Sequence, residues 1–415
     1  MKITLGFGRG TQEVEIPDGR VQAVLLPNPV PHEQEGAAEV ERALDAPIGT
    51  PRLEELARGR HKVAVVTSDM TRPMPSAVVL PPVLQRLRAA GVRDEEITIV
   101  IAVGSHRPMT EEELDRLLGE DIRARYRVVN SIREDMARLG VTAMGTPVDI
   151  ARRVAEADLR VCLGNVEYHY FAGYSGGAKA IMPGCSTPAA IQNNHRRMVE
   201  EAARAGHLAG NPVREDIEEA GALVGIDFLL NVVLDEHKKI IHAAAGHWQQ
   251  AHREACAFLD RLYATPIAAR ADIVLVSQGG APKDLNLYQT QKALDNAKHA
   301  VKDGGIIVLV GSCREGLGQK TFEEWITAAR TPEELVERIR ADFQLGGHKA
   351  AAIALVLQRA RVFLVSEMDE ELVRTAFLEP YRDAQTAMDE ALRLKGPEAS
   401  VIVMPYGGST LPVLK

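Results

Sequence analysis

Short apolar runs alternate with amphipathic stretches along most of the chain. In the first two thirds, four runs rich in β-branched residues predict buried strands, at residues 61–67, 97–103, 126–129 and 159–163. The stretches around them repeat apolar residues at helical spacing, at residues 37–44, 76–90, 214–221 and 249–262. Strands that are apolar on both faces occur in parallel sheets covered by helices. The pattern therefore predicts an α/β fold with mainly parallel, Rossmann-like sheets.

The strand pattern starts again near residue 270. Apolar runs recur at residues 273–277, 305–310, 362–365 and 401–404. Helices are predicted at 333–341 and over 369–394, where Pro380 should interrupt the second one because proline lacks an N–H group. A chain of 415 residues is long for one core. We therefore predict two domains, residues 1–268 and 269–415, and residues 401–415 could cross back to the first domain.

The first sixteen residues predict a β-hairpin. Apolar and polar residues alternate around Ile3–Leu5 and again around Val14–Ile16, and Gly6, Gly8 and Gly10 lie between them. These glycines loosely match a dinucleotide-binding fingerprint, but that loop should open a helix, and here strand-like alternation follows. A hairpin is the better interpretation.

The segment from Glu167 to His195 contains three side chains able to do chemistry. His169, Lys179 and His195 surround a turn of Ser175, Gly176 and Gly177, directly after the predicted strand 159–163. They could supply a proton carrier, a nucleophilic amine and a metal ligand. Each also has an ordinary alternative, such as a hydrogen-bonded loop histidine or a solvated lysine. Their occurrence together favours a functional site.

Two other predicted strands are followed by polar turns. Asp69, Thr71 and Arg72 follow 61–67, and His106 follows 97–103. Ligands of open α/β sheets bind outside the carboxyl ends of the strands, and an arginine fork can hold a carboxylate at two points. The alternatives are a capped helix start beside an exposed arginine, and a histidine that is hydrogen-bonded to a neighbouring loop.

The strand at 273–277 is followed by a similar motif. Tyr288, Gln289 and Lys292 lie close together there, and Gln289 and Lys292 are three residues apart, so one helical face can present both. Lys283 competes with Lys292 as a cation that binds the substrate. Two other polar segments receive no catalytic role. We interpret 211–216 as a structural helix start and 346–349 as a polar turn before a helix from Ala350.

Taken together, these motifs resemble the lactate racemase family, whose members carry a nickel-pincer nucleotide. The resemblance implies that Lys179 binds this cofactor covalently through a thioamide and that His195 is the protein ligand of nickel. It implies acid/base roles for His106 and His169. It further implies that Arg72, Lys292 and Gln289 bind the substrate. The remaining residues implied at the cofactor site are Asp69, Thr71, Ser175, Gly176, Gly177 and Tyr288, of which Asp69 and Thr71 would position the nucleotide or Arg72.

The resemblance also implies an activity. The protein would be an isomerase that inverts the hydroxyl-bearing carbon of a small anionic 2-hydroxy acid, by reversible hydride transfer to the cofactor, in a cleft between the two domains. The cofactor-biosynthesis proteins would be its partners. The segment Asn130–Glu134 replaces the His-Asp pair expected in close family members, which suggests a substrate larger than lactate, such as a sugar or sugar acid. A non-catalytic nickel-cofactor-binding protein remains an alternative. A nicotinamide-dependent dehydrogenase would need a convincing dinucleotide fingerprint, which we do not find.

Composition narrows the class of protein further. The formal net charge of −8 and the pI of about 5.9 argue against a general nucleic-acid binder and against binding to an anionic membrane. Four scattered cysteines show neither zinc-site spacing nor a disulfide framework. The N-terminus lacks the pattern of a signal peptide, and no apolar run reaches the length of a membrane span. We therefore expect a cytoplasmic enzyme.

Overall fold

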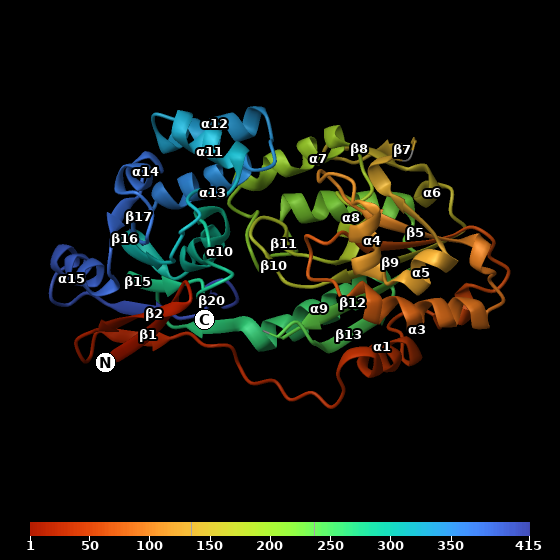
Figure 1. Cartoon of the computed structure of the whole chain (residues 1–415), viewed down its shortest axis with the longest axis horizontal. Coiled ribbons are helices and arrows are strands. Elements are labelled where there is room, and N and C mark those ends of the chain that lie inside the picture. Colours follow the sequence, from red (N-terminus) through yellow and green to blue (C-terminus); the bar gives the residue numbers. More distant parts are fainter. Residues whose placement is uncertain (134, 236) are drawn as a thin grey trace. The chain divides into compact units, whose positions relative to one another are not determined.

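The computed structural model describes residues 1–133, 135–235 and 237–415, with Arg133 described by its backbone alone. The chain forms two compact units. One consists of Val30–Asp260, here called the central unit, and the other joins Met1–Pro29 to Arg261–Lys415 and is called the terminal unit. Each is an α/β unit with its own six-stranded sheet (Figure 1). The fold class predicted from the sequence is confirmed.

The sheet of the central unit has the strand order β13-β12-β9-β4-β5-β6. Five of its strands run parallel, and the edge strand β13 runs antiparallel to β12. The bounds are β4 (Val63–Ser68), β5 (Ile97–Ala102), β6 (Arg127–Asn130), β9 (Leu159–Asn165), β12 (Phe228–Leu234) and β13 (Ile240–Gly246). The apolar runs at 61–67, 97–103, 126–129 and 159–163 form four of these strands, as predicted.

Helices cover this sheet where the amphipathic pattern predicts them. Residues of α1 and α3 pack with alternate residues of the strands in one apolar core, together with Leu114 and Leu118 of α4. The helix α4 begins with a capping box between Thr110 and Glu113. The bounds of the main helices are α1 (Gly36–Asp45), α3 (Ser76–Ala89), α4 (Glu111–Leu118), α8 (Pro212–Val224) and α9 (Trp248–Tyr263).

The order of the strands reverses at β4. After β4 the chain adds β5 and then β6 on one side, and it later returns to place β9 on the other side of β4. In open α/β sheets, ligands bind outside the carboxyl ends of the strands at such a reversal. The topology alone therefore predicts a ligand-binding site at the loops that follow β4 and β9.

The terminal unit contains a fully parallel sheet of strand order β18-β17-β16-β15-β19-β3. Its strands are β3 (Val21–Val24), β15 (Ala271–Ser277), β16 (Val301–Val310), β17 (Ala360–Val365), β18 (Glu379–Tyr381) and β19 (Val401–Met404). The predicted hairpin is present as β1 (Lys2–Phe7) and β2 (Gly10–Glu15), which pair antiparallel. Its apolar residues Ile3, Leu5, Val14 and Ile16 belong to the core of this unit.

The boundaries of the units differ from the predicted 1–268 and 269–415. The first 29 residues belong with the C-terminal part, because β3 extends the terminal sheet beside β19 and the hairpin packs on its core. The last residues stay in the same unit, where β20 (Leu411–Leu414) pairs with β14 (Ala264–Ile267). A local sequence pattern shows that a strand exists but not its partner, so this rearrangement could not be predicted.

The predicted break at Pro380 is present but larger than expected. Pro380 lies in the short edge strand β18, between α14 (Glu370–Thr375) and α15 (Ala384–Lys395). Edge strands tolerate proline because one side of their backbone needs no sheet partner. Within the described ranges, no helix is long and apolar enough to cross a membrane.

Candidate active site

The loops after β4, β5 and β9 carry most of the predicted site residues. The amide of Gly104, after β5, donates to the carbonyl of Gly184 (3.0 Å), and Gly184 in turn donates to the carbonyl of Lys179 (3.1 Å). The buried Ser131 hydroxyl donates to the Gly184 carbonyl (2.9 Å) and accepts from the amide of Val103 (3.3 Å). The loops that carry His106 and Lys179 are therefore joined.

The segment in which the sequence departs from the expected His-Asp pair braces these loops. Besides Ser131, the buried Asn130 bonds both backbone groups of Met109 (2.9 and 3.3 Å). Both side chains are thus used by the backbone around His106. Glu134, the last residue of that segment, lies outside the described residues.

Asp69 orients His106. The Nδ1 atom of His106 lies 2.7 Å from Oδ2 of Asp69, and the Thr71 hydroxyl donates to Oδ1 of Asp69 (2.6 Å). Burial alone would raise the pKa of Asp69, but the hydrogen bonds from His106 and Thr71 outweigh it and lower this pKa. An ionised Asp69 accepts the Nδ1 proton, so the lone pair of the neutral imidazole is on Nε2.

The turn that precedes Lys179 must be glycine. Gly176 and Gly177 have φ angles of 72° and 61°. A Cβ atom would lie 2.6 Å from Oδ1 of Asn231 at Gly176, and 2.9 Å from the ring of His252 at Gly177. Asn231 accepts a hydrogen bond from the amide of Gly177 (2.9 Å). The two buried side chains, from β12 and α9, thus hold the turn in place.

Ser175 closes the same turn through its hydroxyl group. This hydroxyl donates to the carbonyl of Asn165 (2.8 Å) and accepts from the amide of Glu167 (2.9 Å). Nε2 of His252 lies 2.9 Å from the Ser175 carbonyl, to which it donates. The conformation of the turn, and with it the start of the next segment, is fixed from three sides.

Lys179 and His169 lie in a basic cluster, defined here as Arg72, His169, Lys179, His195 and Arg214. Lys179 is part of η3 (Gly177–Ala180) and is half-buried, with its ammonium nitrogen 5.9 Å from the ring centre of Phe171. Burial, and then the charges of Arg214 and Arg72, hold the pKa of Lys179 well below its usual value. In the part of the chain that the structure describes, no carboxylate forms an ion pair with Arg72, Lys179 or Arg214.

His169 is uncharged for the same reasons. It lies on β10 (Tyr168–His169), which pairs with β11 (Gly173–Tyr174). Burial, and then the neighbouring basic groups Lys179 and Arg72, hold the pKa of His169 well below its usual value. Its Nδ1 atom accepts a hydrogen bond from the amide of Ala172 (3.3 Å), so the neutral ring carries its proton on Nε2.

His195 is held in the opposite tautomer. It ends α7 (Pro188–His195) and is only 8% exposed. The amide group of Asn194 donates to the carbonyl of Val213 (3.1 Å) and to Asp216 (2.7 Å), which fixes its orientation. The Asn194 oxygen therefore accepts from Nδ1 of His195 (2.8 Å), and the lone pair of the neutral imidazole is on Nε2. This is the arrangement of a metal-ligating histidine with a supporting partner.

The helix α8 contributes residues that sequence reasoning missed. The segment 211–216 is a helix start, as interpreted, with Asn211 as the cap and Pro212 as the first residue. Yet Arg214 and Asp216 are fully buried, which is rare for charged residues. Arg214 bonds the backbone of the β10–β11 hairpin, and Asp216 bonds Asn194. The sequence does contain a pattern that could have indicated their role, because Asn211 and Arg214 are three residues apart and so share one helix face.

The site residues predicted in the terminal unit lie on α10 (Leu287–Ala297). Asn286 caps this helix by accepting from the amide of Gln289 (3.1 Å). Gln289 is half-buried and Lys292 is exposed, and both belong to the first turns of α10. Tyr288, at the same end of the helix, has its ring 5.7 Å from that of Phe322.

The interpretation of 346–349 as a polar turn is wrong. His348 and Lys349 lie inside α13 (Gly347–Leu357) and are buried. The Lys349 ammonium lies 4.0 Å from the ring centre of Tyr288 and donates to the Tyr288 carbonyl, so these contacts allow its burial. Lys349 therefore helps to position Tyr288.

Comparison with known proteins identifies the family. The model of the lactate racemase N-terminal domain matches residues 7–206, and that of the C-terminal domain matches residues 267–411. The chain belongs to the lactate racemase family. A lactate racemase of Thermoanaerobacterium thermosaccharolyticum is 34% identical over 99% of this chain and 98% of its own length. One of Lactiplantibacillus plantarum is 36% identical over 89% of each chain.

Solved structures agree with this family. The apoprotein structure of the lactate racemase from T. thermosaccharolyticum covers all of both chains, with a TM-score of 0.91 and 33% identity. A structure from Thermotoga maritima, at 20% identity, covers 92% of this chain and all of its own, with a TM-score of 0.64, and shares the fold. The family resemblance inferred from the motifs is confirmed, whereas the roles of individual residues remain predictions.

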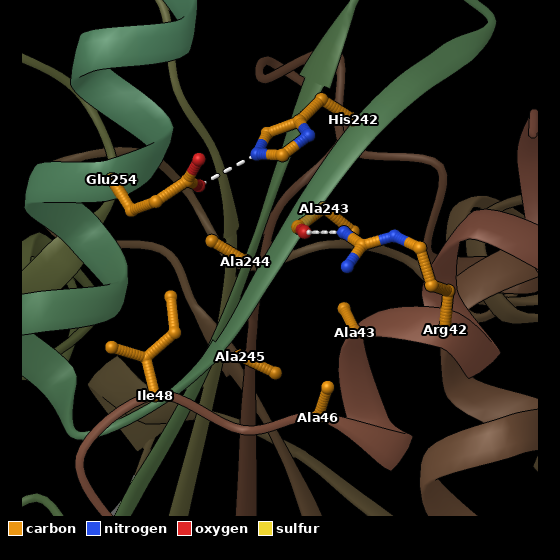
Figure 2. Close-up of a pocket in the computed structure, with 9 residues that line it drawn as sticks. All are labelled: Arg42, Ala43, Ala46, Ile48, His242, Ala243, Ala244, Ala245 and Glu254. Carbon is orange, nitrogen blue, oxygen red and sulfur yellow. Dashed lines mark hydrogen bonds and ion pairs between the residues drawn. The ribbon is translucent and has the colours of Figure 1, made fainter. Parts of the chain in front are cut away.

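The central unit also has a pocket that none of the predicted site residues lines; Arg42, His242 and Glu254 supply its charged and titratable side chains (Figure 2). Its polar groups are paired with one another. Nε2 of His242 lies 2.6 Å from Glu254, and Arg42 donates to the Ala243 carbonyl (2.7 Å) and to both oxygens of Glu39. Because these charges are already balanced, we assign no ligand to this pocket.

The basic cluster predicts an unusual stabilising substitution. Folding lowers the pKa of Lys179. Between this lowered pKa and about pH 10.5, the unfolded chain therefore binds a proton that the folded chain does not, so the folded protein becomes less stable as the pH is lowered. Each unit of lowering costs about 1.4 kcal/mol. Lys179→Met should therefore be more stable than the wild type at pH 7 by about 1 kcal/mol or more, and the difference should narrow towards pH 10.5. Urea unfolding at several pH values measures it.

The matched control is Lys62→Met, because Lys62 is an exposed lysine of the same unit. Its stability should follow that of the wild type at every pH. A Lys179→Met variant that is less stable than the wild type at pH 7, or whose advantage does not change with pH, would contradict a lysine held uncharged by its surroundings.

Proposed function

We propose that this protein is a racemase or epimerase of 2-hydroxy acids that uses a nickel-pincer nucleotide. Its membership of the lactate racemase family supports an isomerase, and two relatives over 30% identical are named lactate racemase. The observation that carries the proposal is the basic cluster, in which burial and basic neighbours lower the pKa of Lys179 and of His169, and in which Arg72, Lys179 and Arg214 form no ion pair with a carboxylate of the described residues. Such a site suits an anionic substrate and a covalently bound anionic cofactor.

The residues present fit this cofactor. The half-buried Lys179 follows a rigid turn and carries the kind of amine that forms a covalent link, here proposed as a thioamide. His195 offers Nε2 as a nickel ligand, with Asn194 and Asp216 behind it. The turn of Ser175–Gly177 and the ring of Tyr288 are proposed to contact the nucleotide. When bound, this group supplies an acceptor that takes hydride from the hydroxyl-bearing carbon and returns it.

Two histidines are proposed to move the proton of the substrate hydroxyl. The lone pair on Nε2 of His106 can take this proton, and the ionised Asp69 would stabilise the imidazolium that forms. His169, which is neutral with its proton on Nε2, can donate a hydrogen bond to the substrate oxygen. To return a proton to that oxygen, a histidine must first be in its protonated form, as His106 is after it has taken the hydroxyl proton.

Substrate binding is proposed to rest on Arg72, Lys292 and Gln289. The guanidinium of Arg72 is exposed and belongs to the turn that carries Asp69 and Thr71, so its position is linked to that of His106. A carboxylate would be held by the arginine fork, with Lys292 as a second cation and Gln289 as a hydrogen-bonding partner. The anion of a 2-hydroxy acid has the charge that these groups require.

The covalent link is tested by the intact mass of protein co-produced with the cofactor-biosynthesis proteins. The wild type should carry an adduct that peptide mapping places on Lys179. Lys179→Ala should lose the adduct and all racemase activity. An adduct that remains on the Ala variant would exclude Lys179 as the attachment point.

The two-histidine mechanism is tested by isotope exchange. His106→Ala and His169→Ala should each slow racemisation in both directions by about a hundredfold or more, since acid/base catalysis contributes at this level. In deuterated water the wild type should invert a 2-hydroxy acid without placing deuterium on its hydroxyl-bearing carbon, because that hydrogen moves as hydride. Rapid deuterium incorporation there would favour a carbanion mechanism instead.

The substrate class is tested with a panel that runs from lactate and malate to aromatic and sugar acids. Arg72→Met and Lys292→Met should each weaken kcat/KM for the best acid by about 1.5–3 kcal/mol, the value of a charge-assisted hydrogen bond. Lys283→Met serves as the control from an exposed loop of the terminal unit and should have little effect. Good turnover of a neutral sugar, with every hydroxy acid ignored, would overturn the carboxylate-binding role.

A further inference from the structure

Arg214 is a buried cation, and no carboxylate of the described residues contacts it directly. Its Nε atom donates to the carbonyl of Ala172 (3.0 Å) and its Nη2 atom donates to the carbonyl of Tyr174. Nη1 is buried and has no hydrogen-bond partner among the described residues. Both acceptors belong to the segment directly before the Ser175–Gly177 turn. Neutral carbonyls orient the guanidinium, but they leave its charge in place.

The helix that carries Arg214 packs directly against the segment of Lys179. Gly221 lies seven residues after Arg214, on the same face of α8. A Cβ atom at Gly221 would lie 2.7 Å from that of Ala178, the neighbour of Lys179. Arg214 also bonds the residue before Ser175, so α8 contacts the chain on both sides of the glycine turn. Its guanidinium is therefore held beside the backbone that leads into the turn before Lys179.

The charged and titratable groups described next, around Lys179 and Arg214, do not cancel the charge of Arg214. Arg72 adds a second cation near Lys179. On α9, burial and then Arg214 hold the pKa of His252 well below its usual value, so this ring is neutral. The carboxylate with the largest influence on Arg214 is that of Glu218, and it forms its ion pair with Arg253 (2.7 Å).

We propose that Arg214 is a positioning residue, which holds the backbone before the turn that carries Lys179 and keeps the Lys179 amine uncharged at neutral pH. Two cations that share a site of low polarity repel each other strongly, and the weaker base gives up its proton. Arginine is the stronger base. Burial lowers the pKa of Arg214 only to about 10, so the guanidinium stays charged at neutral pH. Burial, and then this charge, lowers the pKa of Lys179.

The consequence concerns the covalent role of Lys179, and in this the inference rests on the proposed function. Only the uncharged amine has a lone pair with which to form a bond. An exposed lysine at pH 7 is uncharged in only about one molecule in a few thousand, from its reference pKa of about 10.4. The fixed charge of Arg214 would therefore raise the fraction of protein in which the Lys179 amine is uncharged and able to react, before any cofactor binds.

The test measures the protonation of Lys179 in protein without cofactor. The wild type and its variants are labelled briefly with a trace of acetic anhydride between pH 6 and 11, and acetylation of Lys179 is quantified by peptide mass spectrometry. Lys62 serves as the exposed reference amine. The pH at half-maximal reactivity of Lys179 should lie at least about two units below that of Lys62. Equal midpoints in the wild type would overturn the proposal without any variant.

Two variants separate charge from hydrogen bonding. Arg214→Gln keeps a donor for the carbonyls but loses the charge, and it should raise the Lys179 midpoint by about one pH unit or more. Arg214→Lys keeps a cationic group of lower basicity, so its midpoint should lie between those of the wild type and Arg214→Gln. An unchanged midpoint in Arg214→Gln, or an equal rise in both variants, would overturn the electrostatic role.

A third variant covers the case in which neither substitution at Arg214 folds. Glu218→Gln removes the carboxylate that partly offsets Arg214, so the Lys179 midpoint should fall below that of the wild type. A midpoint that does not move would count against the proposal. Because the protein carries no cofactor in these experiments, the result does not depend on whether a covalent adduct ever forms on Lys179.

Discussion

The constraint on which the rest of the site depends is the crowding of Arg72, Lys179 and Arg214, none of which forms an ion pair with a carboxylate in the described part of the chain. Burial is the largest cause that lowers the pKa of both Lys179 and His169, and basic neighbours add to it, chiefly Arg214 for Lys179 and Lys179 and Arg72 for His169. Such an arrangement lowers the stability of the folded protein, as functional sites often do. It persists because the surrounding backbone is held tightly, by Asn231 and His252 at the glycine turn and by α8 at the β10–β11 hairpin.

The hydrogen-bond partners of the three histidines set their tautomers. Asp69 assigns the proton of His106 to Nδ1, and Asn194 does the same for His195, while the amide of Ala172 leaves the proton of His169 on Nε2. Each ring thereby presents a defined atom, with either a lone pair or a proton. These assignments come from groups that never need to touch a ligand. As a result, His106 and His195 present a lone pair on Nε2, whereas His169 presents a proton there.

The sequence predicts the parts of this molecule that local patterns encode. The strands β4, β5 and β9 and the polar turns after them were visible, because period and turn composition are properties of neighbouring residues. The partners from other elements were not visible. Nothing local indicates that Asn231 reaches Gly177, that Arg214 reaches Ala172, or that β3 pairs with β19. The segment 211–216 is an example of this limit of local patterns. We predicted correctly that a helix starts there, but not that Arg214 and Asp216 within it are buried and support the site.

We propose that Lys179 and Nε2 of His195 are the two points at which the protein holds a nickel-containing group. This can be tested with a crystal structure of the protein co-produced with the cofactor-biosynthesis proteins, with anomalous data collected at the nickel edge. We expect electron density continuous with Nζ of Lys179 and a nickel peak at bonding distance from Nε2 of His195. An unmodified Lys179, or a nickel atom bound through Nδ1 or by other residues, would contradict it.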